Sequence, residues 1–364
     1  MPLAHQTTKT ERIVAEILEV DGFRSTVKRL IEANIFHLSR GVRVPYSSFR
    51  YLSIVFAAGV FLVSAAQSRG FDHKPEHCKP DISFVEFASL DLETQLPITM
   101  KGKLMLPRAC RSRHRYHSQA MPAVLILHGS GGVDSRGDFY ARALNAVGIA
   151  TLEIDMWEAR GVTGVDNRPA LPILSYPDAF ASLAFLANHD AIDPHRIGVL
   201  GFSWGGVMSL AAAEELYADQ FGQGLQFAAH VANYPVCYGA NNPAILPLGI
   251  TPAQAGTQIQ DLTGAPLMIQ VGTEDDYDNG ADNCEALVDQ LAASNNGTDV
   301  SIAIYPDAFH AWDRLQVPIT VPDPFGDEGS FFTTGVLPLI EIIPDVALAY
   351  EARRTVVGFF VRNL

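Results

Sequence analysis

From residue 82 onward, short apolar runs alternate with longer segments in which apolar residues recur every three or four positions. The short runs predict β-strands at 82–90, 99–106, 122–127, 149–154, 196–200, 227–234, 266–271 and 300–305. The longer segments predict helices at 138–147, 177–188, 204–217, 282–293 and 345–361. The first two strands follow one another directly, which favours an antiparallel entry. After them strand and helix take turns, which is typical of an α/β fold with a mostly parallel, doubly wound sheet and helices on both faces.

A second hydrophobic feature lies near the N-terminus. Residues 51–66 form an uncharged, mostly apolar run that follows Arg40, Arg43 and Arg50 and ends on the small residues at 64–66. Basic residues before an apolar run and small residues at its end are typical of a signal peptide, and such a run can also remain as a membrane anchor. The alternative is a buried helix or strand of the main domain.

These patterns divide the chain into four parts. We expect a leader with helical segments at 1–50, the signal-like or anchor segment at 51–66, a polar linker at 67–81 and the main domain at 82–364. Residues 1–66 carry eight Lys and Arg against five Asp and Glu, whereas the whole chain has a net charge of −14. A basic leader before an acidic body predicts a protein that is exported or membrane-anchored. If the apolar run is a core element instead, the protein is cytoplasmic.

Composition restricts the partners and cofactors. With 48% hydrophobic and 18% charged residues, the chain can bury a substantial core. The acidic balance and the lack of a dense Lys/Arg cluster argue against nucleic acid as a partner. The four cysteines contain no C-x-x-C pair, and a calcium loop aligned from Asp276 would need a carboxylate where Leu287 stands. No phosphate-cradling glycine motif is present either, so we expect no metal and no cofactor.

The pentapeptide Gly201-Phe202-Ser203-Trp204-Gly205 lies between a predicted strand and a predicted helix. In that context a G-x-S-x-G sequence indicates a nucleophile elbow, a sharp turn that presents the serine hydroxyl at the edge of the sheet. A side chain at Gly201 or Gly205 is expected to collide with this turn. Ser203 is therefore the candidate nucleophile.

A serine hydroxyl is scarcely ionised at neutral pH, so Ser203 needs a base and a group that orients the base. The chain supplies both downstream, each after a predicted strand: an acidic turn at 274–276 and then His310. His310 is the candidate base. Asp275 is the favoured acid, with Asp276 as the second choice.

The glycine-rich turn at 128–132 follows the strand at 122–127, where open α/β sheets place ligands. An oxyanion needs two amide donors; we expect one from Trp204, the residue after the nucleophile, and one from Ser130 in this turn. His128, which opens the turn, is a candidate for substrate binding. Arg160 is another, either as a partner of a substrate carboxylate or, alternatively, in an ion pair with a nearby Asp.

Several segments together carry a resemblance to a known family: the turn at 128–132, the stretches 155–162 and 193–197, the elbow, the segments 272–276 and 305–313 and the last helix. Over roughly residues 80–364, the chain resembles the dienelactone hydrolase-like family of the α/β-hydrolases. The resemblance implies hydrolysis of a carboxylic ester or lactone, a small-molecule substrate, through a covalent acyl-enzyme. The founding enzymes have cysteine at the elbow, whereas this chain has Ser203 and looks more like the esterase-type relatives. Similar proteins also carry cysteines at the positions of Cys237 and Cys284, which implies that these two lie close enough to form a disulfide.

The leading hypothesis is a serine hydrolase that acts on esters. A peptidase or an acyl transferase on the same fold is an alternative within enzymes. A membrane-tethered binding protein with a vestigial Ser203, Asp275 and His310 is an alternative of another class.

Overall fold

The structure is a computed structural model that describes residues 79–107, 120–164, 167–246, 249–294 and 297–364. The leader at 1–50, the apolar segment at 51–66 and all but the end of the linker lie outside the described residues, as do Cys78 and Cys110. Within the described part, no helix is both long enough and apolar enough to cross a membrane.

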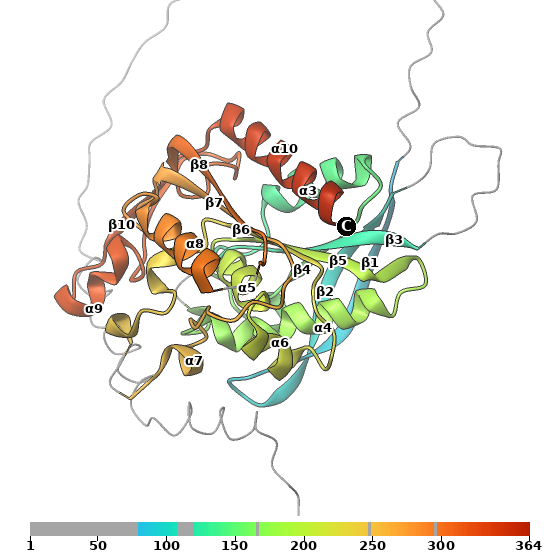
Figure 1. The fold of residues 1–364 in the computed structure, drawn as a ribbon, viewed down its shortest axis with the longest axis horizontal. Coiled ribbons are helices and arrows are strands. Elements are labelled where there is room, and N and C mark those ends of the chain that lie inside the picture. The colour runs from blue at the N-terminus through green and yellow to red at the C-terminus, as the bar shows by residue number, and fades with distance from the viewer. Residues whose placement is uncertain (1–78, 108–119, 165–166, 247–248, 295–296) are drawn as a thin grey trace, which may run out of the picture.

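Eight strands form one sheet in the order β1-β2-β4-β3-β5-β6-β7-β8 (Figure 1). Their bounds are β1 Asp81–Asp91, β2 Leu96–Leu106, β3 Met121–Leu127, β4 Ala150–Asp155, β5 Ile192–Phe202, β6 Ala229–Asn233, β7 Leu267–Glu274 and β8 Val300–Phe309. β1 pairs antiparallel with β2, and β2 pairs antiparallel with β4. Every pair from β4 to β8 is parallel. The expected α/β architecture with an antiparallel entry is confirmed.

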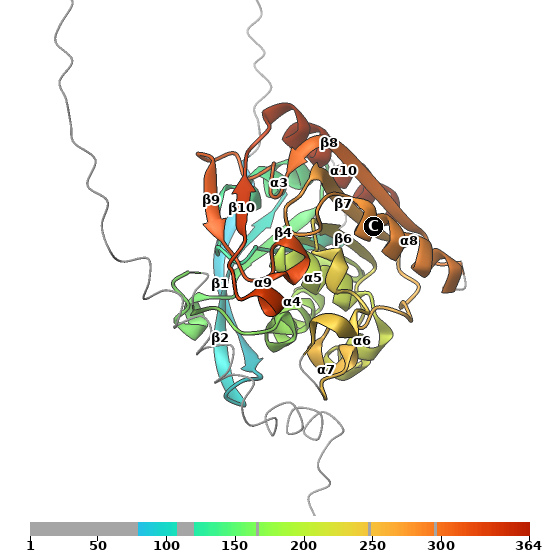
Figure 2. The ribbon, with the colours of Figure 1, turned by 90° about the vertical axis from the view of Figure 1, so that its left-hand side faces the viewer.

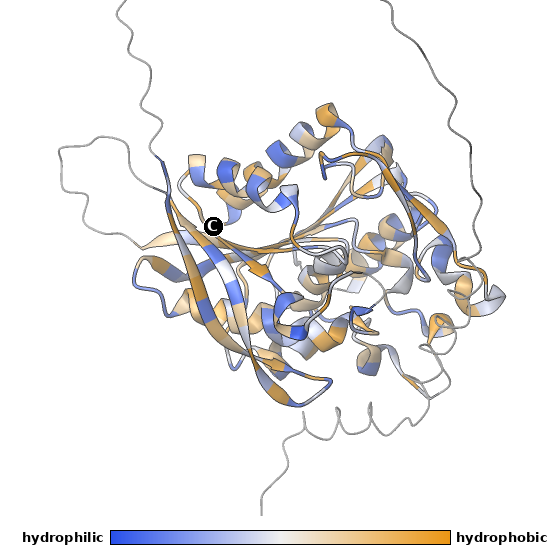
Figure 3. Ribbon diagram, turned by 180° about the vertical axis from the view of Figure 1, so that it is seen from behind, coloured by the Kyte–Doolittle hydropathy of each residue, from blue (hydrophilic) through white to orange (hydrophobic). Residues whose placement is uncertain are grey.

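Helices cover both faces of this sheet. The longer ones are α3 Ser135–Ala146, α4 Tyr176–Ala187, α5 Trp204–Ala212, α6 Glu215–Phe221, α8 Asp282–Ser294 and α10 Val346–Asn363. α3 and α10 contribute to one apolar cluster, whereas α4, α5, α6 and α8 contribute to the other. Alternate residues of β3 enter the two clusters, Leu125 one and Val124 the other, because successive side chains of a strand point to opposite faces. The central strands are accordingly mostly hydrophobic, whereas the helices contain both hydrophobic and hydrophilic residues (Figure 3).

One predicted helix is wrong in its extent. The pattern at 204–217 predicts a single helix, but the structure has two, α5 and α6, separated at Ala213 and Glu214. The Glu214 carboxylate accepts hydrogen bonds from the amides of Gln260 and Asp261, at 2.7 and 2.8 Å. These contacts with a distant loop bend the chain where the local apolar pattern continues without interruption.

Two long loops, one after β6 and one after β8, contain small elements of their own, which the hydrophobic pattern does not predict. They hold α7 Pro252–Ala255, α9 Phe331–Thr334 and the antiparallel pair β9 Ile319–Pro322 and β10 Leu339–Ile342. Figure 2 shows β9, β10 and α9 together on one side of the sheet. These loops surround the carboxyl ends of the parallel strands and therefore shape the candidate site.

We predict that His230, in β6, makes stability depend on pH. Its ring is fully buried, with Nδ1 3.2 Å from the Ser209 carbonyl oxygen, and burial lowers its pKa to about 4. In the unfolded chain the pKa returns to about 6.5. Between these values only the unfolded state binds the proton, so the free energy of unfolding is fully retained above pH 6.5 and falls as the pH drops toward 4.

The His230→Phe variant should lose this component, which amounts to about 2 to 3 kcal/mol between pH 7 and pH 4.5. Urea unfolding of the wild type and the variant at the two pH values measures it. His195→Phe is the matched control because His195 is exposed. Equal pH dependence in the wild type and His230→Phe would contradict the prediction.

Candidate active site

Ser203 lies in a strained turn between β5 and α5. Its backbone has φ 53° and ψ −111°, a conformation with positive φ that residues with a side chain rarely adopt. The neighbouring glycines allow the close approach of the chain: a Cβ at Gly201 would overlap the carbonyl of Gly205, and a Cβ at Gly205 would overlap that of Leu127. The collision expected from the sequence is therefore confirmed for both glycines.

Three candidate residues from separate strands meet at this turn. His310, directly after β8, has its Nε2 3.0 Å from Ser203 Oγ. Its Nδ1 lies 2.8 Å from Oδ2 and 3.0 Å from Oδ1 of Asp275, which follows β7. All three side chains are buried. Parallel strands bring their carboxyl ends to one edge of the sheet, which is why residues 107 and 35 positions from His310 meet it here.

The structure distinguishes the two candidate acids. Asp275 faces His310, and its Oδ1 also accepts the amide of Tyr277 at 3.0 Å. The carboxylate of Asp276 accepts the amide of Glu341 at 2.6 Å, in β10. The chain turns directly after β7, at 276–279, and only the first of the two carboxylates contacts the histidine.

Two tyrosines enclose the His310 ring. The ring centroid of Tyr277 lies 4.3 Å from that of His310, and the centroid of Tyr234 lies 4.8 Å away. Such contacts restrict the rotation of the imidazole and keep its two nitrogens directed at Ser203 and Asp275. Sequence reasoning missed both tyrosines, because neither belongs to a motif that marks the site.

Trp204 and Ser130 are the residues expected to supply the oxyanion donors. The Ser203 amide donates to the Asn233 carbonyl and the Gly205 amide to the His128 carbonyl. Within the described residues, neither the Trp204 amide nor the Ser130 amide has an acceptor. Ser130, Ser203 and Trp204 line the same cavity. Both amides thus belong to residues that line the cavity with Ser203, and neither has an acceptor within the described part of the chain, so their role as oxyanion donors stays a prediction.

The structure gives His128 a different position from the one expected for a substrate-binding residue. Its Nε2 accepts the amide of Met156 at 3.0 Å, and its Nδ1 donates to the Gly129 carbonyl at 2.7 Å. Burial lowers its pKa to about 4, so the ring is neutral at pH 7. With both nitrogens occupied, His128 ties the glycine-rich turn to the segment after β4, and it does not line the cavity.

Arg160 forms the ion pair that the sequence left as one of two alternatives. Its guanidinium contacts the buried carboxylate of Asp178, in α4, at 2.7 and 3.2 Å and donates to the Met156 carbonyl. Ser89, in β1, donates to the same carboxylate at 2.6 Å. Arg160 does not line the cavity, so the structure does not support a contact with a substrate carboxylate.

A cavity of about 540 Å³ opens beside Ser203. Its walls come from α5 and from the loops at 168–172, 235–259 and 323–333. Arg168 and Asp323 also line the cavity and form an ion pair. Each terminal nitrogen of Arg168 lies 2.9 Å from one carboxylate oxygen of Asp323. The sequence could not reveal this pair, because its members lie 155 positions apart in loops without a motif.

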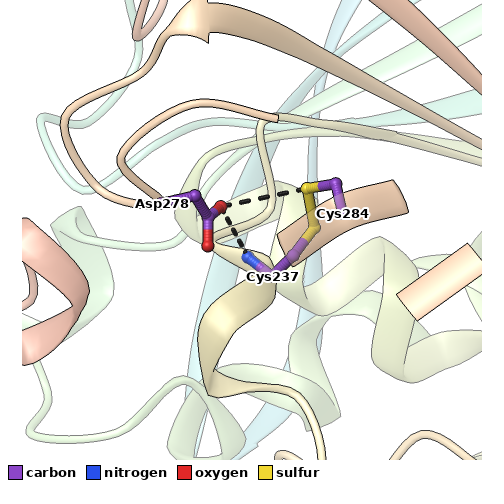
Figure 4. Close-up of side chains that lie close together, drawn as sticks. All are labelled: Cys237, Asp278 and Cys284. Atoms are coloured by element: carbon purple, nitrogen blue, oxygen red, sulfur yellow. Dashed lines mark hydrogen bonds between the residues drawn. A yellow bond between two sulfur atoms is a disulfide. The ribbon is translucent and has the colours of Figure 1, made fainter. Parts of the chain in front are cut away.

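A disulfide joins Cys237, after β6, to Cys284 in α8, as the resemblance implied. The Asp278 carboxylate points at this bond in Figure 4, accepts the amides of Cys237 and Tyr238 at 2.8 and 2.6 Å, and lies 3.8 Å from the Cys284 sulfur. Burial raises the pKa of Asp278 to about 7. Two cysteines and a carboxylate are metal-ligating types, but the paired sulfurs offer no thiolate. The cluster instead fixes the segment that carries Tyr238, a residue of the cavity wall.

Comparison with known proteins finds one matching family model and several similar solved structures. The model of the dienelactone hydrolase family matches residues 113–321, and no curated protein sequence matches the chain. Among solved structures, the chain is similar to the propionate-bound esterase Est2 of Thermogutta terrifontis, with a TM-score of 0.53, 14% identity, and coverage of 80% of this chain and 97% of that chain.

Two further structures have a lower overall similarity. A dienelactone hydrolase from Anabaena variabilis has a TM-score of 0.46 at 19% identity and covers 79% of this chain and 100% of its own. An esterase from Pyrococcus furiosus has a TM-score of 0.45 at 16% identity and covers 77% of this chain and 93% of its own. The family model spans more than half of the sequence, so the chain belongs to the dienelactone hydrolase family, and its mostly parallel eight-stranded sheet with helices on both faces has the α/β-hydrolase fold.

Proposed function

We propose that the protein is a serine hydrolase that cleaves a carboxylic ester or lactone through a covalent acyl-enzyme. One observation carries the proposal: His310 lies between Ser203 Oγ, 3.0 Å from its Nε2, and Asp275, 2.8 Å from its Nδ1. This is the arrangement by which a histidine takes a proton from a serine hydroxyl while a carboxylate holds the ring in the required tautomer.

In the proposed first step, the Asp275 carboxylate accepts a hydrogen bond from Nδ1–H of His310. The lone pair of Nε2 then faces the hydroxyl of Ser203. Ser203 Oγ attacks the carbonyl carbon of the ester as its proton moves to Nε2, and the carbonyl oxygen becomes an oxyanion. Asp275 stabilises the imidazolium that forms.

The amides of Trp204 and Ser130 would stabilise this oxyanion, because neither donates within the described part of the chain. Collapse of the tetrahedral intermediate breaks the bond to the alcohol oxygen, which takes the proton from His310 Nε2. Water then attacks the acyl-enzyme, with His310 as base, and returns Ser203 and the free acid.

A labelling experiment tests the proposal. A fluorophosphonate reacts with a serine only when the hydroxyl is activated, so we expect one adduct, located by peptide mass spectrometry on Ser203. The heat-denatured protein is the control and should remain unlabelled. Turnover of 4-nitrophenyl esters should accompany labelling. Labelling with cleavage of peptide anilides but not of esters would favour a peptidase, and the absence of both labelling and turnover would favour a binding protein.

A further inference from the structure

The cavity beside Ser203 is lined mainly by hydrocarbon. Val207 and Leu210 of α5, Ile245 and Ile259 of the loop after β6, and Phe325 and Phe332 of the loop around α9 form much of its wall. A volume of about 540 Å³ is within the range of small-molecule sites. Walls of this kind favour a ligand with an apolar group because the group leaves water on binding.

Arg168 and Asp323 are the only charged side chains among the described residues of the cavity wall. Each nitrogen of the Arg168 fork contacts one oxygen of Asp323 at 2.9 Å, and both side chains are largely buried, at 8% and 2% exposure. Asp323 accepts two further hydrogen bonds, from the Tyr277 hydroxyl and the Phe325 amide, each at 3.0 Å. The wall therefore carries two opposite charges that neutralise each other in a fixed geometry.

The Arg168 guanidinium is also held from the side. It lies over the rings of Trp204 and Phe325, at 5.4 and 5.5 Å from their centroids. Asp323 occupies both nitrogens of the Arg168 fork, so a substrate carboxylate that took over this fork would leave Asp323 as a buried charge without its partner. Such an exchange is unfavourable, since the incoming carboxylate also loses its own hydration.

Other arginines near the site are committed elsewhere. Arg136 is bound by Asp134 and by the Tyr234 hydroxyl, and Arg160 by Asp178. Neither lines the cavity. Within the described residues, therefore, an anionic substrate finds no cation beside Ser203 that is not already neutralised by a carboxylate.

We propose that the substrate is an uncharged ester or lactone with a sizeable apolar group, and that Asp323 excludes anionic esters by neutralising Arg168. This inference rests on the proposed function and specifies its substrate class. Asp323 is a specificity-determining residue here: it touches no reacting atom and acts through the arginine.

Two esters that differ in one terminal group test the proposal, 4-nitrophenyl hexanoate and mono-4-nitrophenyl adipate, which has a carboxylate in place of the terminal methyl. We expect the wild type to prefer the hexanoate by about 100-fold in kcat/KM, because the carboxylate would be buried without a partner. From acetate to hexanoate, kcat/KM should rise about threefold to fourfold per methylene. Equal kcat/KM for hexanoate and adipate, or no gain with chain length, would overturn the proposal.

The Asp323→Asn variant removes the negative charge that pairs with Arg168 and keeps the wall nearly isosteric. We expect the ratio of kcat/KM for adipate to that for hexanoate to rise at least about tenfold. The Arg168→Gln variant, which leaves the carboxylate, should lower that ratio. Asp219→Asn is the control, since it makes the same charge change on the exposed side of α6.

The outcomes separate this inference from the proposed function. An unchanged ratio in Asp323→Asn refutes the selectivity role, even if the enzyme cleaves both esters. If the wild type cleaves neither ester and takes no fluorophosphonate, the proposed function fails instead. Should Asp323→Asn not fold, the wild-type preference and the chain-length series still decide the substrate class.

Discussion

Replacement of Ser203 by alanine is expected to lower kcat for ester hydrolysis by about 10⁴- to 10⁶-fold and to abolish fluorophosphonate labelling. The substitution removes only the oxygen that lies 3.0 Å from His310 Nε2. Without it no acyl-enzyme can form, and the remaining acceleration comes from substrate binding and from amides around the carbonyl oxygen. Steady-state kinetics with 4-nitrophenyl butyrate, after purification free of host esterases, measures the loss.

Ser209→Ala is the matched control for this prediction. Ser209 is also a buried serine of α5, but its hydroxyl donates to the Val199 carbonyl at 3.4 Å and not to a histidine. We expect this variant to be labelled and to turn over ester as the wild type does. If Ser203→Ala retained wild-type kcat while Ser209→Ala lost it, the assignment of the nucleophile would be wrong.

The second large effect concerns the acid. We expect Asp275→Asn to lower kcat by about 10⁴-fold. An asparagine at this position can present its carbonyl oxygen or its amide nitrogen to His310 Nδ1, and it carries no charge to stabilise the imidazolium. The loss should appear in kcat and in kcat/KM alike, because the effect arises as the imidazolium forms in the transition state.

Asp276→Asn is the internal comparison, one residue away and with the same loss of charge. Its carboxylate accepts the Glu341 amide and makes no contact with His310. This variant should therefore keep most of the activity and lose some stability at the contact with β10, which thermal unfolding detects. A larger loss of kcat in Asp276→Asn than in Asp275→Asn would show that the acid is misassigned.

Much of the fold could be predicted because it depends on local patterns. A run such as 122–127 is apolar throughout because β3 is covered on both faces, and period and length are enough to recognise such a strand. The elbow can likewise be recognised from its glycines, since any side chain at Gly201 or Gly205 would overlap backbone carbonyls. The order of Ser203, Asp275 and His310 along the chain, each after a strand, places them at one edge without any knowledge of contacts.

Other features of the site depend on contacts that no local pattern contains. Asp275 and Asp276 are adjacent and chemically identical, and the difference between them is which one faces His310 and which one faces β10. Arg160 could have met a substrate or an aspartate, and Asp178, on another element, decides it. The break between α5 and α6 has the same origin, because Glu214 binds amides 46 and 47 positions away.

The sequence by itself thus determined the mostly parallel sheet, the strained turn at Ser203, and the meeting of Ser203, His310 and an acidic turn at one edge of the sheet. Periodicity, glycine sterics and strand order are properties of neighbouring residues, and they are enough for these features. Only the tertiary structure decided the character of the cavity. The pairing of Arg168 with Asp323 joins two loops that are 155 positions apart, and its strength comes from burial and a fixed geometry. Burial and geometry exist only once the loops have packed over the edge of the sheet.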